Sequence, residues 1–185
     1  MKLLRVGPKG REKPGVLDAN GDIRDVSGLV DDWDGMALAD SVLTRLKKTD
    51  LSGLPKLDGK SRIGPCVAGV GKFICIGLNY ADHAAETGAD VPAEPVIFFK
   101  ATSAICGPND HLEIPRRSEK TDWEVELGVV IGKEAKYVSQ DDALDYVAGY
   151  CVVHDVSPQQ FLHAGDVVTL GIAGLGEQKQ VCVNA

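Results

Sequence analysis

Three acidic side chains recur at every second position in the segment TDWEVELGVVIG, residues 121–132. If this segment is a strand, successive side chains alternate between two faces, so Asp122, Glu124 and Glu126 lie on the same face. The residues between them are apolar, and we expect these to point into a core: Trp123, Val125 and Leu127. Like charges beside a core are costly unless they are neutralised, and a hard cation such as Mg²⁺ prefers carboxylate oxygens. The pattern therefore predicts a divalent-metal site, with an exposed acidic edge that prevents sheet pairing as the alternative.

A second apolar segment, AGYCVVHDVS at residues 148–157, ends abruptly in His154 and Asp155. Ligand residues often lie where a rigid strand ends in a loop, so Asp155 is a candidate third carboxylate beside Glu124 and Glu126. A structural role is favoured for His154, because an all-oxygen site suits Mg²⁺ whereas a nitrogen ligand favours a transition metal.

A histidine and a glutamate follow a third apolar segment, in FICIGLNYADHAAETG at residues 73–88. On a helix His83 and Glu86 occupy positions i and i+3 of one face, where the carboxylate can orient the imidazole and tune its charge. Such a pair is suited to general acid–base chemistry. A solvated helix face with a chance His–Glu pair is the alternative.

The elements that must position these residues are mostly strands. We expect β-rich segments bounded by Gly, Pro or Asp at residues 73–77, 95–100, 125–132 and 146–157. Ser139 can cap a short helix over residues 140–145, with Asp142 at the capping-box position. The segment VVTLGIAGLGEQKQ predicts two strands joined at Gly174.

The first part of the chain has a different character. The dipeptide Asn20-Gly21 lies between two short alternating segments and predicts a hairpin. Residues 37–48 have the apolar spacing of a short helix, and residues 51–65 are rich in Gly, Pro and Ser, which is typical of a linker.

The composition is that of a globular chain, with 185 residues of which 44% are hydrophobic and 25% charged. We expect a β-dominated α+β class, with a small N-terminal α+β domain and its linker over residues 1–68 and a second domain over residues 69–185. The net charge of −7 and the scattered Lys and Arg argue against nucleic acid and an anionic membrane surface as partners. No apolar stretch approaches the roughly 18 residues of a membrane span, and no signal peptide is evident, so we expect a cytoplasmic protein.

The five cysteines form an odd set without CxxC spacing, mostly in apolar contexts: Cys66, Cys75, Cys106, Cys151 and Cys182. We interpret them as small buried side chains in a reducing compartment, neither a disulfide framework nor a zinc site. Nothing in the sequence favours a nucleophilic thiol.

Four motifs in this order resemble the fumarylacetoacetate hydrolase family: GLNYADHAAE, PVIFFK, DWEVELGVVIG and GYCVVHDVS. The branch that they resemble is the bacterial group acting on 2-keto and 2,4-diketo acids, or a ureidoglycolate lyase-like branch. The resemblance covers nearly all of residues 1–162 and resumes at AGDVVTLGIAGLGEQKQ. It implies a mixed β-roll for the second domain, and a homodimer.

The resemblance also implies roles for the site residues. Glu124, Glu126 and Asp155 would bind Mg²⁺, or Mn²⁺ or Ca²⁺, and the cation would hold the substrate and stabilise an enolate. His83, oriented by Glu86, would activate water for attack on a carbonyl. Substrate contacts are assigned to Tyr80, Lys100 and Gln159.

The chain departs from the family pattern after Ser157. The family continues with an arginine that binds the substrate carboxylate, whereas this chain has the neutral Gln159, which cannot replace a bidentate guanidinium. The family also has a long middle portion, with a catalytic lysine and a Gly/Thr/Pro turn, where this chain joins directly near residues 161–164. The expected β-roll is therefore incomplete.

These observations predict a divalent-metal-dependent hydrolase that cleaves a C–C bond in a 2,4-diketo acid, either an acylpyruvate or a dehydrated sugar acid. One alternative is a catalytically impaired metal-binding remnant, or a partner of a full-length relative, which Gln159 and the short join favour. A lyase, isomerase or decarboxylase of the same family is the other, since a fold does not fix a reaction.

Overall fold

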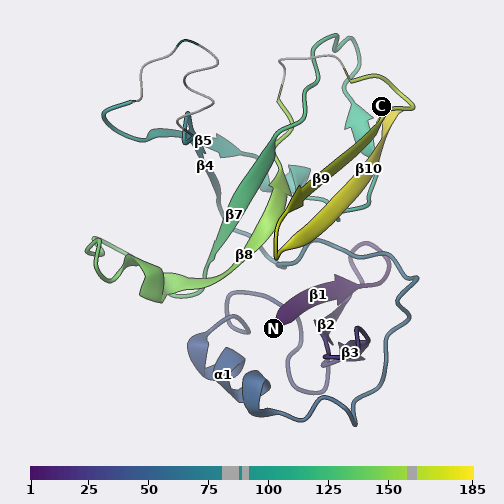
Figure 1. Cartoon of the computed structure of the whole chain (residues 1–185), viewed down its shortest axis with the longest axis vertical. Coiled ribbons are helices and arrows are strands. Elements are labelled where there is room, and N and C mark those ends of the chain that lie inside the picture. Colours follow the sequence, from purple (N-terminus) through teal and green to yellow (C-terminus); the bar gives the residue numbers. More distant parts are fainter. Residues whose placement is uncertain (81–87, 89–91, 158–161) are drawn as a thin grey trace. The chain divides into compact units, whose positions relative to one another are not determined.

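The computed structural model describes residues 1–80, 88, 92–157 and 162–185 (Figure 1). Contacts divide the chain into one unit formed by residues 1–68 with residues 106–185, and another formed by residues 69–105. The division into a small N-terminal domain and a catalytic domain over residues 69–185 stays a prediction.

The first unit begins with a three-stranded antiparallel sheet in the order β1-β2-β3, with β1 at Lys2–Val6, β2 at Lys13–Leu17 and β3 at Ile23–Asp25. The turn between β2 and β3 confirms the predicted hairpin. There Asp18 Oδ1 accepts hydrogen bonds from the backbone N–H groups of Asn20 at 2.9 Å and Asp22 at 3.0 Å. Gly21 adopts a φ of +84°, a conformation that a residue without Cβ takes at little cost.

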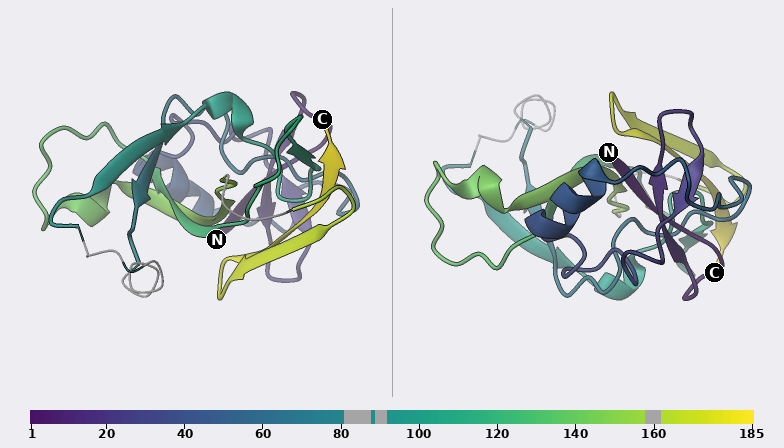
Figure 2. Two further views of the ribbon diagram at one scale, coloured as in Figure 1. Left: turned by 90° about the horizontal axis from the view of Figure 1, so that it is seen from above. Right: turned by 90° about the horizontal axis from the view of Figure 1, so that it is seen from below.

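Helix α1, Asp40–Lys48, confirms the predicted helix and buries Leu43 and Leu46. These side chains belong to a core cluster centred on a fully buried Trp33, with the remaining members Val16, Val26, Ala37 and Leu38. Val130 and Ala148 pack against this cluster, so α1 lies beneath the hairpin that carries them (Figure 2). No helix in the described ranges is long and apolar enough to cross a membrane.

That hairpin consists of β7, Val125–Ile131, and β8, Val147–His154, which pair antiparallel. The connection holds a 3₁₀ helix, η2 at Ala143–Tyr146, in place of the expected helix over residues 140–145. Ser139 does hydrogen-bond Asp142, through its hydroxyl to Oδ2 at 2.7 Å and from the Asp142 backbone N–H at 3.2 Å.

A second sheet in the first unit has the strand order β6-β10-β9. Its strands are β6 at Leu112–Ile114, β9 at Val167–Ile172 and β10 at Gly176–Asn184. β9 and β10 are antiparallel and turn at Gly174, as predicted, with a φ of +84° at that glycine. Around this sheet a second buried cluster forms, which includes Leu162 and Cys182.

The second unit is a two-stranded antiparallel ribbon, β4 at Phe73–Gly77 and β5 at Val96–Lys100, followed by the 3₁₀ helix η1 at Thr102–Ala104. Both strands were predicted within one residue. The β-dominated α+β class is confirmed, since ten strands and one α-helix are found in the described residues.

One expectation about packing is wrong. The apolar face of β7 was expected to point into a core, but Trp123 is 46% exposed and Val125 and Leu127 are exposed to a similar extent. The Trp33 cluster packs on the other side of the hairpin, where it contacts Val130 and Ala148. Alternation shows which residues share a face, but it does not show which face receives a layer.

Candidate metal and acid–base site

The register of the β7–β8 hairpin decides where the predicted carboxylates lie. Val125 pairs with His154 and Glu126 with Val153. Just beyond β7, the backbone N–H of Asp155 donates to the carbonyl of Glu124 at 2.9 Å, so these two residues are directly opposite each other. Opposite residues of an antiparallel pair share a face, and Glu126 joins them two residues along the same strand.

The pairing extends past the strand ends and holds this edge in place. Asp122 donates its backbone N–H to the Ser157 carbonyl at 2.7 Å. Its Oδ1 accepts the backbone N–H of Trp123 at 2.7 Å, so the Asp122 carboxylate is used locally. Asp155 is buried, whereas Glu124 and Glu126 are half-buried. Glu124, Glu126 and Asp155 each interact with at least one other group.

Donor chemistry and register fit a hard divalent cation, because two Glu and one Asp share one face of a paired strand end. Within the ranges that the structure describes, no group of three or more His, Cys, Asp or Glu residues is arranged to hold a metal ion. Metal binding by Glu124, Glu126 and Asp155 therefore stays a prediction.

His154 has its contacts away from the carboxylates, since neighbouring residues of a strand alternate faces. Its Nδ1 lies 2.6 Å from Oε1 of Gln180 on β10. Gln180 uses its amide N–H groups to donate to the Asp110 carbonyl at 3.2 Å and to Cys106 Sγ at 3.6 Å. We therefore assign the N–H to His154 Nδ1, which donates to Gln180. This contact agrees with the structural role expected for His154.

The remaining predicted site residues belong to other parts of the chain. Tyr80 and Lys100 lie in the second unit, where Tyr80 is exposed and Lys100 ends β5 opposite Phe73. Both make contacts with other residues. The proposed dyad of His83 and Glu86, and also Gln159, lie outside the described residues.

One backbone feature near Tyr80 was not foreseen. Leu78 has a φ of +50°, in the left-handed region that side chains with a Cβ rarely adopt. It directly follows β4 and precedes the segment of the predicted dyad. Such outliers cluster at functional sites, and the residue types around Leu78 did not predict its backbone conformation.

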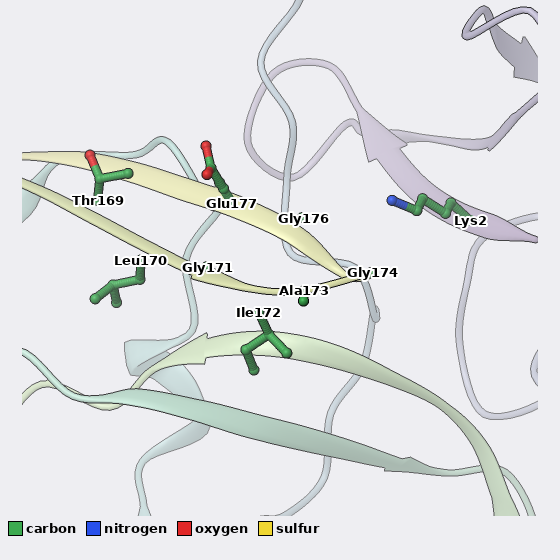
Figure 3. Close-up of a pocket in the computed structure, with 9 residues that line it drawn as sticks. All are labelled: Lys2, Thr169, Leu170, Gly171, Ile172, Ala173, Gly174, Gly176 and Glu177. Carbon is green, nitrogen blue, oxygen red and sulfur yellow. The ribbon is translucent and has the colours of Figure 1, made fainter.

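Two open hollows lie in the first unit, and neither contains the predicted site. One of about 550 Å³ is formed by the β9–β10 turn and β1, and Figure 3 shows Lys2 reaching from β1 toward Gly174. The other, of about 390 Å³, is lined by Trp123, Leu162 and residues 166–170. Neither lining set contains an acid–base pair or a group of metal ligands.

Comparison with known proteins gives a consistent result. Residues 72–161 match the family described as fumarylacetoacetate (FAA) hydrolase C-terminal. A Burkholderia ambifaria protein with a provisional hydrolase name is 65% identical over 161 residues, which is 87% of this chain and 57% of that protein. The chain thus spans little more than half the length of the curated relatives that it matches.

Solved structures agree with this match. A fumarylacetoacetate hydrolase from Exiguobacterium antarcticum is 32% identical, with a TM-score of 0.66 over 85% of this chain and 56% of that one. A maleylpyruvate hydrolase from Sphingobium sp. SYK-6, solved with manganese(II) ion and pyruvate, has a TM-score of 0.81 over both full chains at 16% identity. At that identity the likeness establishes the fold alone.

Proposed function

Because the chain belongs to the fumarylacetoacetate hydrolase family, we propose that it is a divalent-metal-dependent hydrolase that cleaves a C–C bond in a 2,4-diketo acid. An acylpyruvate or a dehydrated sugar acid is the proposed substrate class. The observation that carries the proposal is the register of the β7–β8 hairpin, which places three carboxylates on one face at a strand end.

Glu124, Glu126 and Asp155 are the proposed ligands of Mg²⁺, with Mn²⁺ or Ca²⁺ as substitutes. Half-burial of the two glutamates and burial of Asp155 make a neutralising cation favourable, since ionised carboxylates away from water are costly. When bound, such a cation supplies Lewis acidity, which polarises a carbonyl oxygen and stabilises enolate charge. The manganese and pyruvate named for the Sphingobium enzyme support this choice of metal class and of a keto acid.

The proposed acid–base work belongs to His83 and Glu86. Glu86 orients the imidazole, and a ring nitrogen of His83 accepts the proton of the water that attacks the carbonyl. A positioned general base of this kind contributes about 10²–10⁴-fold to a rate. Tyr80 and Lys100 are proposed to contact the substrate, with the Lys100 ammonium as the cationic donor.

Two departures from the family lower the expected rate. Gln159 replaces a charged arginine contact to the substrate carboxylate, and truncating one partner of a buried charge pair costs roughly 2–5 kcal/mol. The missing lysine removes a donor of the kind that contributes about 10²–10³-fold. These losses are comparable to the whole contribution of the dyad. We therefore expect metal-dependent activity that is weak beside that of a full-length relative.

Titration calorimetry with Mg²⁺ and Mn²⁺ tests the metal site. Glu126→Gln keeps the size of the side chain and removes its charge, so binding should be lost or greatly weakened. Glu134→Gln is the matched control, because Glu134 is exposed and lies beyond the end of β7. Equal affinity in the wild type and Glu126→Gln would remove Glu126 from the site.

Turnover of an acylpyruvate by the purified chain tests the reaction. Residual activity should depend on the metal and vanish in His83→Ala. Robust turnover that His83→Ala does not change would mean that other residues carry the reaction.

A second candidate function is that of a metal-binding partner of a full-length relative. The partly exposed apolar face of β7 favours it, because Trp123, Val125 and Leu127 leave apolar surface open to a partner on a chain that spans 57% of its relatives' length. In that case the chain alone would bind Mg²⁺ without turnover. Adding it to a full-length relative would then change that relative's activity.

A further inference from the structure

Strand β10 contacts the β7–β8 hairpin through two glutamine side chains. Gln178 Nε2 donates to the backbone carbonyl of Val152 at 2.6 Å, and Gln180 Oε1 lies 2.6 Å from His154 Nδ1. Both contacts join residues that are 26 positions apart, so β10 and β8 run in the same direction here. In each strand the two contacting residues are two positions apart, and they therefore share a face. β10 thus holds one face of β8 at two successive positions.

β10 is well placed to act as a support, because it is the middle strand of its sheet. One edge pairs with β9 over residues 176–181, and β6 pairs with residues 182–184. The backbone N–H of Lys179 also donates to the Pro108 carbonyl at 3.1 Å and to Asn109 Oδ1 at 3.2 Å. Side chains on a strand that is fixed in this way can hold a neighbouring element precisely.

The Gln180 side chain is fixed at both ends of its amide. It is only 3% exposed, and its Nε2 donates to the Asp110 carbonyl at 3.2 Å and to Cys106 Sγ at 3.6 Å. A carbonyl oxygen can only accept a hydrogen bond, so the Asp110 contact determines which end of the amide is the nitrogen. The oxygen of Gln180 is therefore the atom that faces His154.

The half-buried His154 ring depends on this one contact. Its Nδ1–H donates to Gln180, whereas its Nε2 is buried and has no hydrogen-bond partner in the described part of the chain. The hydrogen bond of one ring nitrogen sets the tautomer and the orientation of an imidazole. Gln180 therefore fixes both for His154.

His154 lies where it can restrain the predicted metal ligands. It is the last residue of β8 and is opposite Val125, which separates Glu124 from Glu126. The next residue, Asp155, donates its backbone N–H to the Glu124 carbonyl at 2.9 Å. Neighbouring residues of a strand point to opposite faces, so the ring and the Asp155 carboxylate are on different sides of the hairpin. A contact on the ring's side thus restrains the backbone from which the carboxylates project.

We propose that Gln180 and His154 are positioning residues for the divalent-metal site. Gln180 orients the His154 ring, and the ring holds the end of β8 in the register that brings Asp155 beside the two glutamate ligands. The inference rests on the proposed metal site, but the contacts that carry it do not involve a metal. Partners outside a ligand set typically contribute about 10–100-fold to metal affinity, and we expect about tenfold because Gln180 acts through a further residue.

Amide hydrogen exchange, followed by NMR in the metal-free protein, tests this support. Gln180→Met keeps the length of the side chain and removes the oxygen that His154 contacts. The Asp155 amide should then exchange about tenfold faster by local opening of the strand end, which is the effect of losing roughly one hydrogen bond. Val168→Ala is the matched control, because Val168 is buried opposite Gln180 on β9 and has no polar side-chain atom. It should lower the stability to urea and leave the Asp155 exchange unchanged.

A double-mutant cycle separates positioning from a general loss of stability. His154→Phe keeps a planar ring and removes Nδ1, so adding Gln180→Met should speed the Asp155 exchange no further. If the two effects add in full, Gln180 does not act through His154 and the inference is wrong. Should Gln180→Met not fold, Gln178→Met tests the same support, because Gln178 is half-buried and donates to Val152. Faster exchange at Asp155 is expected there, and unchanged exchange would contradict the proposal.

Calorimetric titration with Mn²⁺ connects this support to the metal site. The affinity of Gln180→Met should fall about tenfold, while Val168→Ala should keep the wild-type value. Equal affinity in the wild type and Gln180→Met would overturn the inference and leave the proposed metal site standing. A wild type that binds no Mn²⁺ would instead overturn the proposed metal site, and the metal role of Gln180 with it, even where the exchange result holds.

Discussion

Arg62 should be one of the most costly charged residues to replace. Its Nε and Nη2 donate to both oxygens of Asp110 at 2.6 Å, and its Nη1 donates to Glu12 Oε1 at 2.8 Å. The Glu12 side chain is only 3% exposed, and it has a second, weaker partner in Arg5 at 3.4 Å. Arg62 therefore joins the linker segment to the N-terminal sheet and to the loop that leads into β6.

Replacement of Arg62 by methionine keeps much of the stem and removes the charge. Removing one partner of a buried ion pair costs about 3–5 kcal/mol, whereas breaking an exposed pair costs about 0–1 kcal/mol. Arg62 is 25% exposed and Glu12 keeps Arg5, so we expect a loss of about 2–3 kcal/mol in the free energy of unfolding. For a chain of this length that corresponds to roughly 5–10 °C in the thermal midpoint.

Urea unfolding followed by circular dichroism measures the loss. Lys13→Met is the matched control, because Lys13 pairs with Asp25 at 3.1 Å but is 59% exposed, and it should cost less than about 1 kcal/mol. Adding Asp110→Asn to Arg62→Met should cost less than the sum of the two single changes, since the carboxylate no longer lacks its partner. If Arg62→Met unfolds at the same urea concentration as Lys13→Met, the ion pairs of Arg62 with Glu12 and Asp110 contribute no more to stability than an exposed pair.

The Arg62 network also predicts the direction in which the free energy of unfolding changes with pH. The hydrogen bonds from Arg62 hold the pKa of Asp110 below its ordinary value. At Glu12 burial raises the pKa, but the Arg62 hydrogen bond, a backbone hydrogen bond and the charges of Arg5 and Arg62 together lower it. A lowered pKa contributes stability above the unfolded value, and this is lost as pH falls through the folded value. The difference between the wild type and Arg62→Met should thus be full near pH 7 and shrink below about pH 4.

Two further predictions concern the core and the assembly. Trp33→Phe should lower the free energy of unfolding by about 1–3 kcal/mol, measured by thermal unfolding. The indole N–H donates to the carbonyls of Leu4 at 2.8 Å and Gly15 at 3.2 Å, and both carbonyls would lose this donor. Val26→Ala, at another fully buried position, measures the cost of lost volume alone. Light scattering at tens of micromolar should give a dimer or larger species, since exposed apolar strands favour association; a monodisperse monomer would contradict this expectation.

Sequence patterns located most strands because the runs are bounded by turn residues. Gly174 and Asn20-Gly21 mark turns whose backbone conformation few other residues adopt, and both hairpins were predicted. Alternation around Glu124 and Glu126 correctly placed both on one face of a strand. Strands β1 and β6 were missed, since LEI is too short to show a period and KLLRV does not alternate between apolar and polar residues.

The partners of a residue across the fold were not predictable in the same way. Arg62 bonds Asp110, 48 residues further along the chain, and the pKa of that carboxyl is lowered mainly by this distant partner rather than by neighbours in the sequence. Trp33 became the centre of the core although no periodic run surrounds it. The exposure of Trp123 shows the same limit, because the covering layer is a property of the whole chain.

The two faces of the β7–β8 hairpin link assembly to the proposed chemistry. The side-chain period of a strand is two, so a slip of one residue would move Glu124 and Glu126 to the opposite face and separate them from Asp155. On the Gly128 side of the hairpin, Val130 and Ala148 pack on the Trp33 cluster. Whatever covers the exposed Trp123 side would favour this register over its alternatives. Affinity for the divalent cation should therefore rise as the chain associates, and calorimetry across a range of protein concentrations should show this dependence. If the affinity stays the same across the range in which the chain associates, the isolated hairpin already holds the carboxylates in place.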